Sequence, residues 1–124
     1  MKNKILLVDD DLDIGFAVDL TLSDSGYEVK HVKSGEECIE LLGKTDYKPD
    51  LVLLDIMMPG INGWEVYRWL KENPRCEKIP IVFLTARVDR TAENAGSFLG
   101  DDYIEKPYDP DDLKRRIEKI LGSK

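Results

Sequence analysis

Five short segments of the chain are apolar or alternate between apolar and polar residues, and each predicts a β-strand. The most apolar segment, Leu-Val-Leu-Leu at 51–54, has no polar face, which is typical of a strand buried between two layers of helices. The pairs Pro59-Gly60 and Asn62-Gly63 then predict turns before the next helical pattern. The predicted strands are residues 4–8, 27–32, 51–54, 80–84 and 102–105.

A helical pattern follows each predicted strand, because apolar residues recur there every three or four positions. Ser34 and Glu37 form a capping-box pattern before the second helix, and Asp109-Pro110 predicts an N-cap and first turn for the fifth. Gly96 weakens the fourth pattern. The inner faces of the five predicted helices are Ile14, Ala17, Val18, Thr21 and Leu22; Cys38, Leu41 and Leu42; Val66, Trp69 and Leu70; Val88, Ala92, Ala95 and Leu99; and Leu113, Ile117, Ile120 and Leu121.

Alternating strands and helices with short connections predict an α/β fold. We expect a doubly wound, five-stranded parallel sheet with helices on both faces and right-handed crossovers. The length favours one domain over residues 1–124, with a core that needs no disulfide or metal. In such sheets, ligands bind outside the carboxyl ends of the strands, near the point where the strand order reverses.

Composition narrows the classes of function. The net charge of −7 argues against sequence-independent nucleic-acid binding, because an acidic surface repels phosphates. No apolar run approaches the roughly 20 residues of a membrane span, and no signal peptide is evident, so we expect a cytoplasmic protein. Cys38 and Cys76 lack the spacing of metal or redox motifs, which favours two free thiols over a disulfide.

Polar side chains stand at the carboxyl ends of four predicted strands. Asp9 and Asp10 follow the first strand, Asp55 the third, Thr85 the fourth and Lys106 the fifth. Three carboxylates that converge in one cleft repel one another unless a hard cation lies among them, and Mg²⁺ suits oxygen ligands of this kind. A hydroxyl and an ammonium on the other side would hold the oxygens of a phosphate.

A carboxylate can also be the nucleophile that forms an acyl phosphate. Asp55 is the best placed for this role, since it ends the central strand between the acid pair and the positions of Thr85 and Lys106. Magnesium would then neutralise the charge of the incoming phosphoryl group. The residues therefore predict an aspartyl phosphate at Asp55.

These residues form a pattern that resembles the receiver domain of two-component response regulators, and the resemblance covers essentially the whole chain. The matching set is Asp9-Asp10, Asp55 with Met58-Pro59-Gly60 and Asn62-Gly63, Thr85-Ala86, and Lys106-Pro107. The resemblance implies a flavodoxin-like sheet of strand order 2-1-3-4-5. It also implies that Asp55 accepts a phosphoryl group from a histidine kinase or phosphotransfer protein.

Further roles follow from the resemblance alone. Mg²⁺ would be held by Asp10, Asp55 and the backbone carbonyl of Met57, with Asp9 contributing through water. The phosphoryl oxygens would be held by the Thr85 hydroxyl, the Lys106 ammonium and the Ala86 backbone amide, and the Lys106–Pro107 bond would be cis.

The resemblance also implies a conformational switch. Thr85 would move toward the phosphate while Tyr103 turns inward, which would reshape the surface formed by the fourth helix, fifth strand and fifth helix for an effector protein. Such a domain catalyses only its own phosphorylation and dephosphorylation, so it is a switch rather than an enzyme in the usual sense. It would be a monomer or a weak dimer linked to phosphorylation.

Other interpretations remain open from the residues themselves. Asp9-Asp10-Asp11 could be a solvated helix start, and His31, placed far from the acids, could be structural. A phosphate-ester hydrolase would need a second acid where Met57 stands. A flavin-binding electron carrier would need a Ser/Thr/Gly-rich loop where the acids stand. A receiver-shaped interaction module that works without phosphorylation is the main alternative.

Overall fold

The computed structural model of the chain describes residues 3–86, 102–106 and 108–122. Its strands form one parallel sheet in the order β2-β1-β3-β4-β5, as predicted, so the strand order reverses between β1 and β3. Their bounds are β1 (Lys4–Val8), β2 (Glu28–Val32), β3 (Leu51–Asp55), β4 (Ile81–Ala86) and β5 (Asp102–Lys106).

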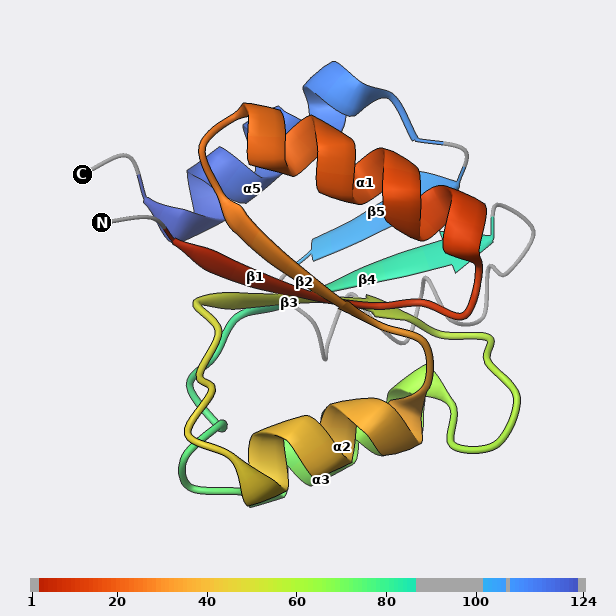
Figure 1. The fold of residues 1–124 in the computed structure, drawn as a ribbon, viewed down its shortest axis with the longest axis vertical. Coiled ribbons are helices and arrows are strands. Elements are labelled where there is room, and N and C mark those ends of the chain that lie inside the picture. Colours follow the sequence, from red (N-terminus) through yellow and green to blue (C-terminus); the bar gives the residue numbers. More distant parts are fainter. Residues whose placement is uncertain (1–2, 87–101, 107, 123–124) are drawn as a thin grey trace.

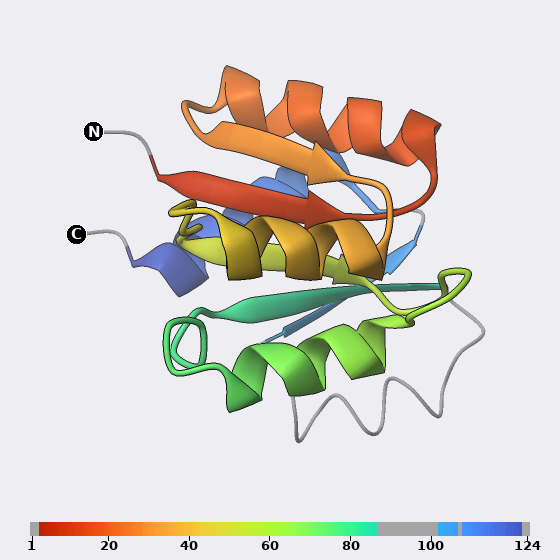
Figure 2. The same ribbon diagram turned by 60° about the horizontal axis from the view of Figure 1, so that its bottom comes forward.

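Helices cover both faces of the sheet. The helices α1 (Leu12–Asp24) and α5 (Pro110–Leu121) lie on one face, and α2 (Gly35–Lys44) and α3 (Gly63–Glu72) lie on the other (Figure 1). Figure 2 shows the sheet as a layer between these two pairs. The predicted helix over residues 88–99 lies outside the described residues. None of the described helices has the length and apolar character needed to cross a membrane.

The sheet is buried on both faces because the inner strands are apolar through their central positions, with polar residues only at their ends. In β1, Ile5 and Leu7 pack toward α1 and α5, whereas Leu6 and Val8 pack toward α2 and α3, and all four are fully buried. Burying one such side chain stabilises the fold by roughly 1.5–3 kcal/mol. The strand β3 is buried along its whole length, including Asp55. The central strand therefore ends in a carboxylate that is almost inaccessible to water.

Local signals fix the helix starts at the carboxyl edge of the sheet. The Asp11 side chain caps α1 by accepting from the amides of Asp13 and Ile14 at 2.9 and 3.1 Å. At α3, Asn62 and Glu65 form a reciprocal capping box that the sequence analysis did not identify. These caps satisfy backbone donors that would otherwise lie unpaired beside the acids.

At α2, the Ser34 hydroxyl accepts from the Glu37 amide at 3.0 Å, as predicted. The Glu37 carboxylate accepts from the amide of Lys33, one residue before the cap, and not from the Ser34 amide that the predicted capping box requires. Both free cysteines, Cys38 and Cys76, are buried, which agrees with the expectation of two free thiols.

Gly63 lets the start of α3 approach the end of β3. Its amide donates to the Ile56 carbonyl at 2.9 Å. A methyl group at position 63 would lie 2.5 Å from the Asp55 carbonyl oxygen and 2.7 Å from the Ile56 Cα. The backbone that follows Asp55 is therefore held against α3 by a contact that only glycine allows.

Replacing Gly63 by alanine is expected to destabilise the protein by about 1–3 kcal/mol through this overlap, although alanine is the better helix former. Gly43→Ala is the matched control, because a methyl there would meet only the Trp69 ring at 3.5 Å, an ordinary contact. It should leave stability unchanged or raise it by up to about 1 kcal/mol. Urea unfolding measures both variants, and equal effects would contradict the close approach at Gly63.

Candidate functional site

Three carboxylates meet at the carboxyl edge of the sheet. Asp9 and Asp10 follow β1 and Asp55 ends β3, and carboxylate oxygens of the three lie within 4.8 Å of one another. Asp9 and Asp55 are buried, whereas Asp10 is exposed. The structure thus brings together the predicted acids, with Asp10 on the side from which solvent and ions approach.

Lys106, at the end of β5, supplies a positive charge to this cluster. Its ammonium lies 2.9 Å from Asp9 Oδ2 and 3.4 Å from Asp55 Oδ1. The other oxygen of Asp9 accepts from the Asp11 amide at 2.9 Å, so both Asp9 oxygens have partners within the protein. Asp9 is therefore held on both side-chain oxygens within the protein.

Burial and neighbouring charges shift the protonation of this cluster. Burial, together with the charges of Asp9 and Asp10, raises the pKa of Asp55 from 3.8 to about 7, although Lys106 acts in the opposite direction. Burial alone would lower the pKa of Lys106, but its contacts with Asp9 and Asp55 outweigh burial, so that its pKa is raised. The acids therefore need more positive charge than Lys106 provides.

This donor set fits a hard divalent cation. All its ligand atoms are carboxylate oxygens, the ligand type that Mg²⁺ prefers, and burial and neighbouring negative charge, which raise the pKa of Asp55, are effects that a cation would offset. Met57 lies in the loop two residues after Asp55. The chemistry of these groups thus allows Asp10 and Asp55 to hold an ion at the mouth of the site.

Thr85 and Ala86 end β4, between the strands that carry Asp55 and Lys106. In the register of the sheet, Leu84 pairs with Asp55, and Ala86 pairs with Lys106. Their backbones thus stand at the edge where a phosphate was predicted. Their side chains lie outside the described part of the structure, as does Pro107, so the Thr85 hydroxyl and the cis Lys106–Pro107 bond remain predictions.

The Tyr103 ring belongs to an aromatic cluster on the α3 side of the sheet. It stacks on Phe83 with ring centroids 5.3 Å apart, and Phe83 contacts the rings of Trp64 and Tyr67 at 4.8 and 5.6 Å. Because Trp64 lies in the first turn of α3, a movement of Tyr103 would alter packing near the loop that follows Asp55.

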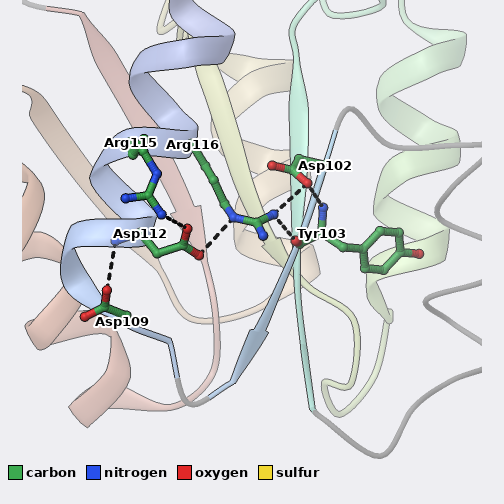
Figure 3. A network of polar contacts seen from close by, with 6 residues as sticks. All are labelled: Asp102, Tyr103, Asp109, Asp112, Arg115 and Arg116. Carbon is green, nitrogen blue, oxygen red and sulfur yellow. Dashed lines mark hydrogen bonds and ion pairs between the residues drawn. The ribbon is translucent and has the colours of Figure 1, made fainter.

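The backbone of Tyr103 is held on the other side by α5 (Figure 3). The Arg116 guanidinium donates to the Tyr103 carbonyl and the Asp102 carboxylate, both at 2.9 Å, and also to the Asp112 carboxylate at 2.9 Å. Figure 3 shows the Tyr103 ring pointing away from this network toward α3. These contacts restrain the backbone of β5 at Tyr103, whereas the Tyr103 ring packs on Phe83 instead.

The prediction that His31 lies far from the acids is wrong. Its Nε2 lies 2.8 Å from the Asp9 backbone carbonyl oxygen. The reason is the strand order, because β2 pairs with β1 and so ends beside the residues that follow β1. The predicted order 2-1-3-4-5 already contained this signal, which the sequence analysis did not use for His31.

A second feature that the sequence analysis missed is an exposed apolar stripe on α1. Leu12, Phe16 and Leu20 are 60%, 72% and 63% exposed and are spaced four residues apart, so they share one face of the helix. Only the inner apolar face of this helix was predicted. A repeat of apolar residues at 12, 16 and 20 was the available signal.

Comparison with known proteins assigns the family. The model of the response regulator receiver domain matches residues 5–118. YrkP of Bacillus subtilis, an uncharacterized transcriptional regulatory protein, is 39% identical over 118 residues, which are 94% of this chain and 48% of YrkP. The phosphate regulon transcriptional regulatory protein PhoB of Pseudomonas aeruginosa is 37% identical over 94% of this chain and 51% of PhoB. The chain spans about half the length of these relatives.

Solved structures agree with this assignment. A putative response regulator from Chloroflexus aurantiacus superposes with a TM-score of 0.90 at 34% identity, covering 98% of both chains. The chemotaxis protein CheY4 of Vibrio cholerae gives a TM-score of 0.86 at 26% identity, covering 97% of this chain and 99% of CheY4. The chain belongs to the response regulator receiver domain family. It is a receiver of two-component phosphorelay signalling, as the sequence analysis predicted.

The raised pKa of Asp55 predicts how its charge affects stability. Between about pH 4 and about pH 7 the folded state holds a proton on Asp55 that the unfolded state releases, so stability falls as the pH rises through this window. Asp55→Asn resembles the protonated acid. In EDTA at about pH 8 it should raise the free energy of unfolding by roughly 1–3 kcal/mol, and at about pH 5 by much less.

Urea unfolding at both pH values measures this difference. Asp46→Asn, on an exposed turn, is the control and should change stability little at either pH. A stabilisation of equal size at both pH values, or a loss of stability at the higher one, would show that ionisation of Asp55 does not destabilise the folded state.

Proposed function

We propose that Asp55 accepts a phosphoryl group from the phosphohistidine of a histidine kinase or phosphotransfer protein, in a Mg²⁺-dependent reaction. The observation that carries this proposal is a buried carboxylate at the end of the central strand, clustered with two more acids and paired with Lys106 at 3.4 Å. A carboxylate in this position is a nucleophile whose charge the site can balance. Membership of the receiver family supports the same role.

Each residue of the site has a part in the proposed transfer. A carboxylate oxygen of Asp55 attacks phosphorus, the bond from phosphorus to the donor's histidine nitrogen breaks, and the electron pair stays on that nitrogen. Lys106 pairs with the oxygens that carry the developing charge, together with the Thr85 hydroxyl and the Ala86 amide. When bound, Mg²⁺ would neutralise part of the charge of the phosphoryl group.

The ligands of that Mg²⁺ would be Asp10, Asp55 and the Met57 carbonyl, with Asp9 acting through water. The two Asp9 oxygens already accept from Lys106 and the Asp11 amide, which supports the indirect role of Asp9. Mg²⁺ is commonly bound by one or two carboxylates together with a phosphate, and these residues and an incoming phosphoryl group would supply such ligands.

Phosphorylation would shift a balance between two conformers. Thr85 would move toward the phosphate and the Tyr103 ring would turn inward, changing the surface around β5 and α5 that a downstream effector protein contacts. Tyr103 stacks on Phe83, so a turn of its ring would change the packing of the cluster that includes Trp64. Arg116 holds the strand itself in place.

The exposed stripe on α1 is the proposed docking surface for the phosphodonor. Leu12 lies two residues after Asp10, so the stripe begins at the mouth of the site and extends away from it through Phe16 and Leu20. A protein donor must bind so that its phosphohistidine lies against Asp55. An exposed apolar helix face next to the site provides a surface for that binding. Small phosphodonors would not need it.

The remaining expectations are part of the same proposal. The chain would act as one receiver domain over residues 1–124 in the cytoplasm, without direct binding of nucleic acid, as a monomer or weak phosphorylation-linked dimer. The phosphorylation-independent interaction module is the alternative, and it predicts that the acid cluster does not respond to phosphoryl mimics.

Beryllofluoride, a phosphoryl mimic, is expected to change tryptophan fluorescence saturably and only when Mg²⁺ is present. The reason is that Trp64 contacts Phe83, on which Tyr103 stacks. Asp55→Asn should abolish the change, and Trp69→Phe should keep it because Trp64 remains. An equal response of Asp55→Asn and the native protein would contradict Asp55 as the acceptor.

Phe16→Asp is expected to slow phosphotransfer from a phosphohistidine protein by about tenfold or more, the effect of losing one central apolar contact. Phosphorylation by acetyl phosphate should be unchanged, because no docking is required. Phe16→Leu is the matched control and should stay close to the native rate with both donors. A loss of both reactions would indicate damage to the site rather than to docking.

A further inference from the structure

We infer that His31 is a positioning residue for the acidic site, a role that rests on the proposed function. By donating a hydrogen bond from Nε2 to the Asp9 backbone carbonyl, it fixes the orientation of the peptide that joins Asp9 to Asp10. The two acids are thereby held in place for the divalent cation.

Both backbone groups of Asp9 are bound by the end of β2. The Asp9 amide donates to the Val32 carbonyl at 3.2 Å, and the Asp9 carbonyl accepts from His31 Nε2 at 2.8 Å. A carbonyl oxygen only accepts, so Nε2 must carry the proton. The structure therefore specifies the Nε2–H tautomer, or a ring that carries both protons.

The planarity of the peptide bond passes this restraint to Asp10. The Asp9 carbonyl, the Asp10 amide and the Asp10 Cα share one plane, so holding the oxygen limits rotation of the whole unit. Asp9 also has both side-chain oxygens bound, by Lys106 and the Asp11 amide. Asp10 is exposed, and the peptide that precedes it is its link to this fixed network.

Gly15 provides the space that the His31 ring occupies. It is buried in the first part of α1, and a methyl group built at position 15 would overlap the imidazole ring. A glycine inside a helix lowers helix stability, so the close fit accounts for a residue that helix formation alone would not favour. The ring therefore lies between α1 and the sheet, directly beside the connection that bears the acids.

A ring that only filled space between α1 and β2 would not need a donor at Nε2. His31→Gln and His31→Phe separate the two roles, because the glutamine amide can donate from a similar position, whereas phenylalanine keeps an aromatic ring without a donor. Loss of a hydrogen bond behind a metal ligand typically weakens metal binding by about 10–100-fold.

The test is the Mg²⁺ dissociation constant of each variant, measured by calorimetry, with thermal unfolding in EDTA as a separate readout of the fold. We expect His31→Phe and Gly15→Ala to raise the constant by about tenfold. His31→Gln should remain within about threefold of the native protein, and Lys30→Gln, on the exposed face of β2, should match it. NMR of the native imidazole should show a proton on Nε2.

Three results would overturn the inference: native affinity in His31→Phe, equal loss in His31→Gln and His31→Phe, or a neutral native ring protonated only at Nδ1. In each case the native protein still binds Mg²⁺, so the proposed function stands. A native protein that binds no Mg²⁺ would instead overturn the metal-dependent function, together with the positioning role that depends on it.

Discussion

The contact of one ammonium with two buried carboxylates is the constraint on which the site depends. Lys106 lies 2.9 Å from Asp9 and 3.4 Å from Asp55, and these three residues come from the ends of different strands. Leaving a carboxylate buried without a partner is costly, so the sheet edge is stable only when β1, β3 and β5 end at the same level. The register of the parallel sheet meets this requirement.

The three acids at that edge carry more negative charge than Lys106 balances, and this excess links the fold to phosphorylation. Lys106 pairs with two buried acids beside the exposed Asp10, and burial, together with the charges of Asp9 and Asp10, raises the pKa of Asp55 to about 7. Positive charge from Mg²⁺ would stabilise the ionised acid, and the phosphoryl group would then alter the balance again. The surrounding caps and close contacts hold the backbone, so the response can be confined to side chains such as Tyr103.

Much of this architecture could be predicted from the sequence, because the strands are apolar and the chemistry falls at their ends. Asp55 follows an uninterrupted apolar run, and Lys106 follows the last strand, so a parallel sheet places both residues at its carboxyl edge. The contact of His31 with Asp9 was missed because it depends on which strands are neighbours. The outer stripe of α1 at Phe16 was missed because the inner face alone explained the helix.

The most direct measurement is to locate the phosphoryl group after phosphorylation with Mg²⁺. Borohydride reduces an aspartyl phosphate to homoserine, and mass spectrometry identifies the residue that was changed. The account predicts homoserine at Asp55, dependent on Mg²⁺. Homoserine at Asp9 or Asp10 instead, or no modification under conditions in which another receiver domain is phosphorylated, would contradict it.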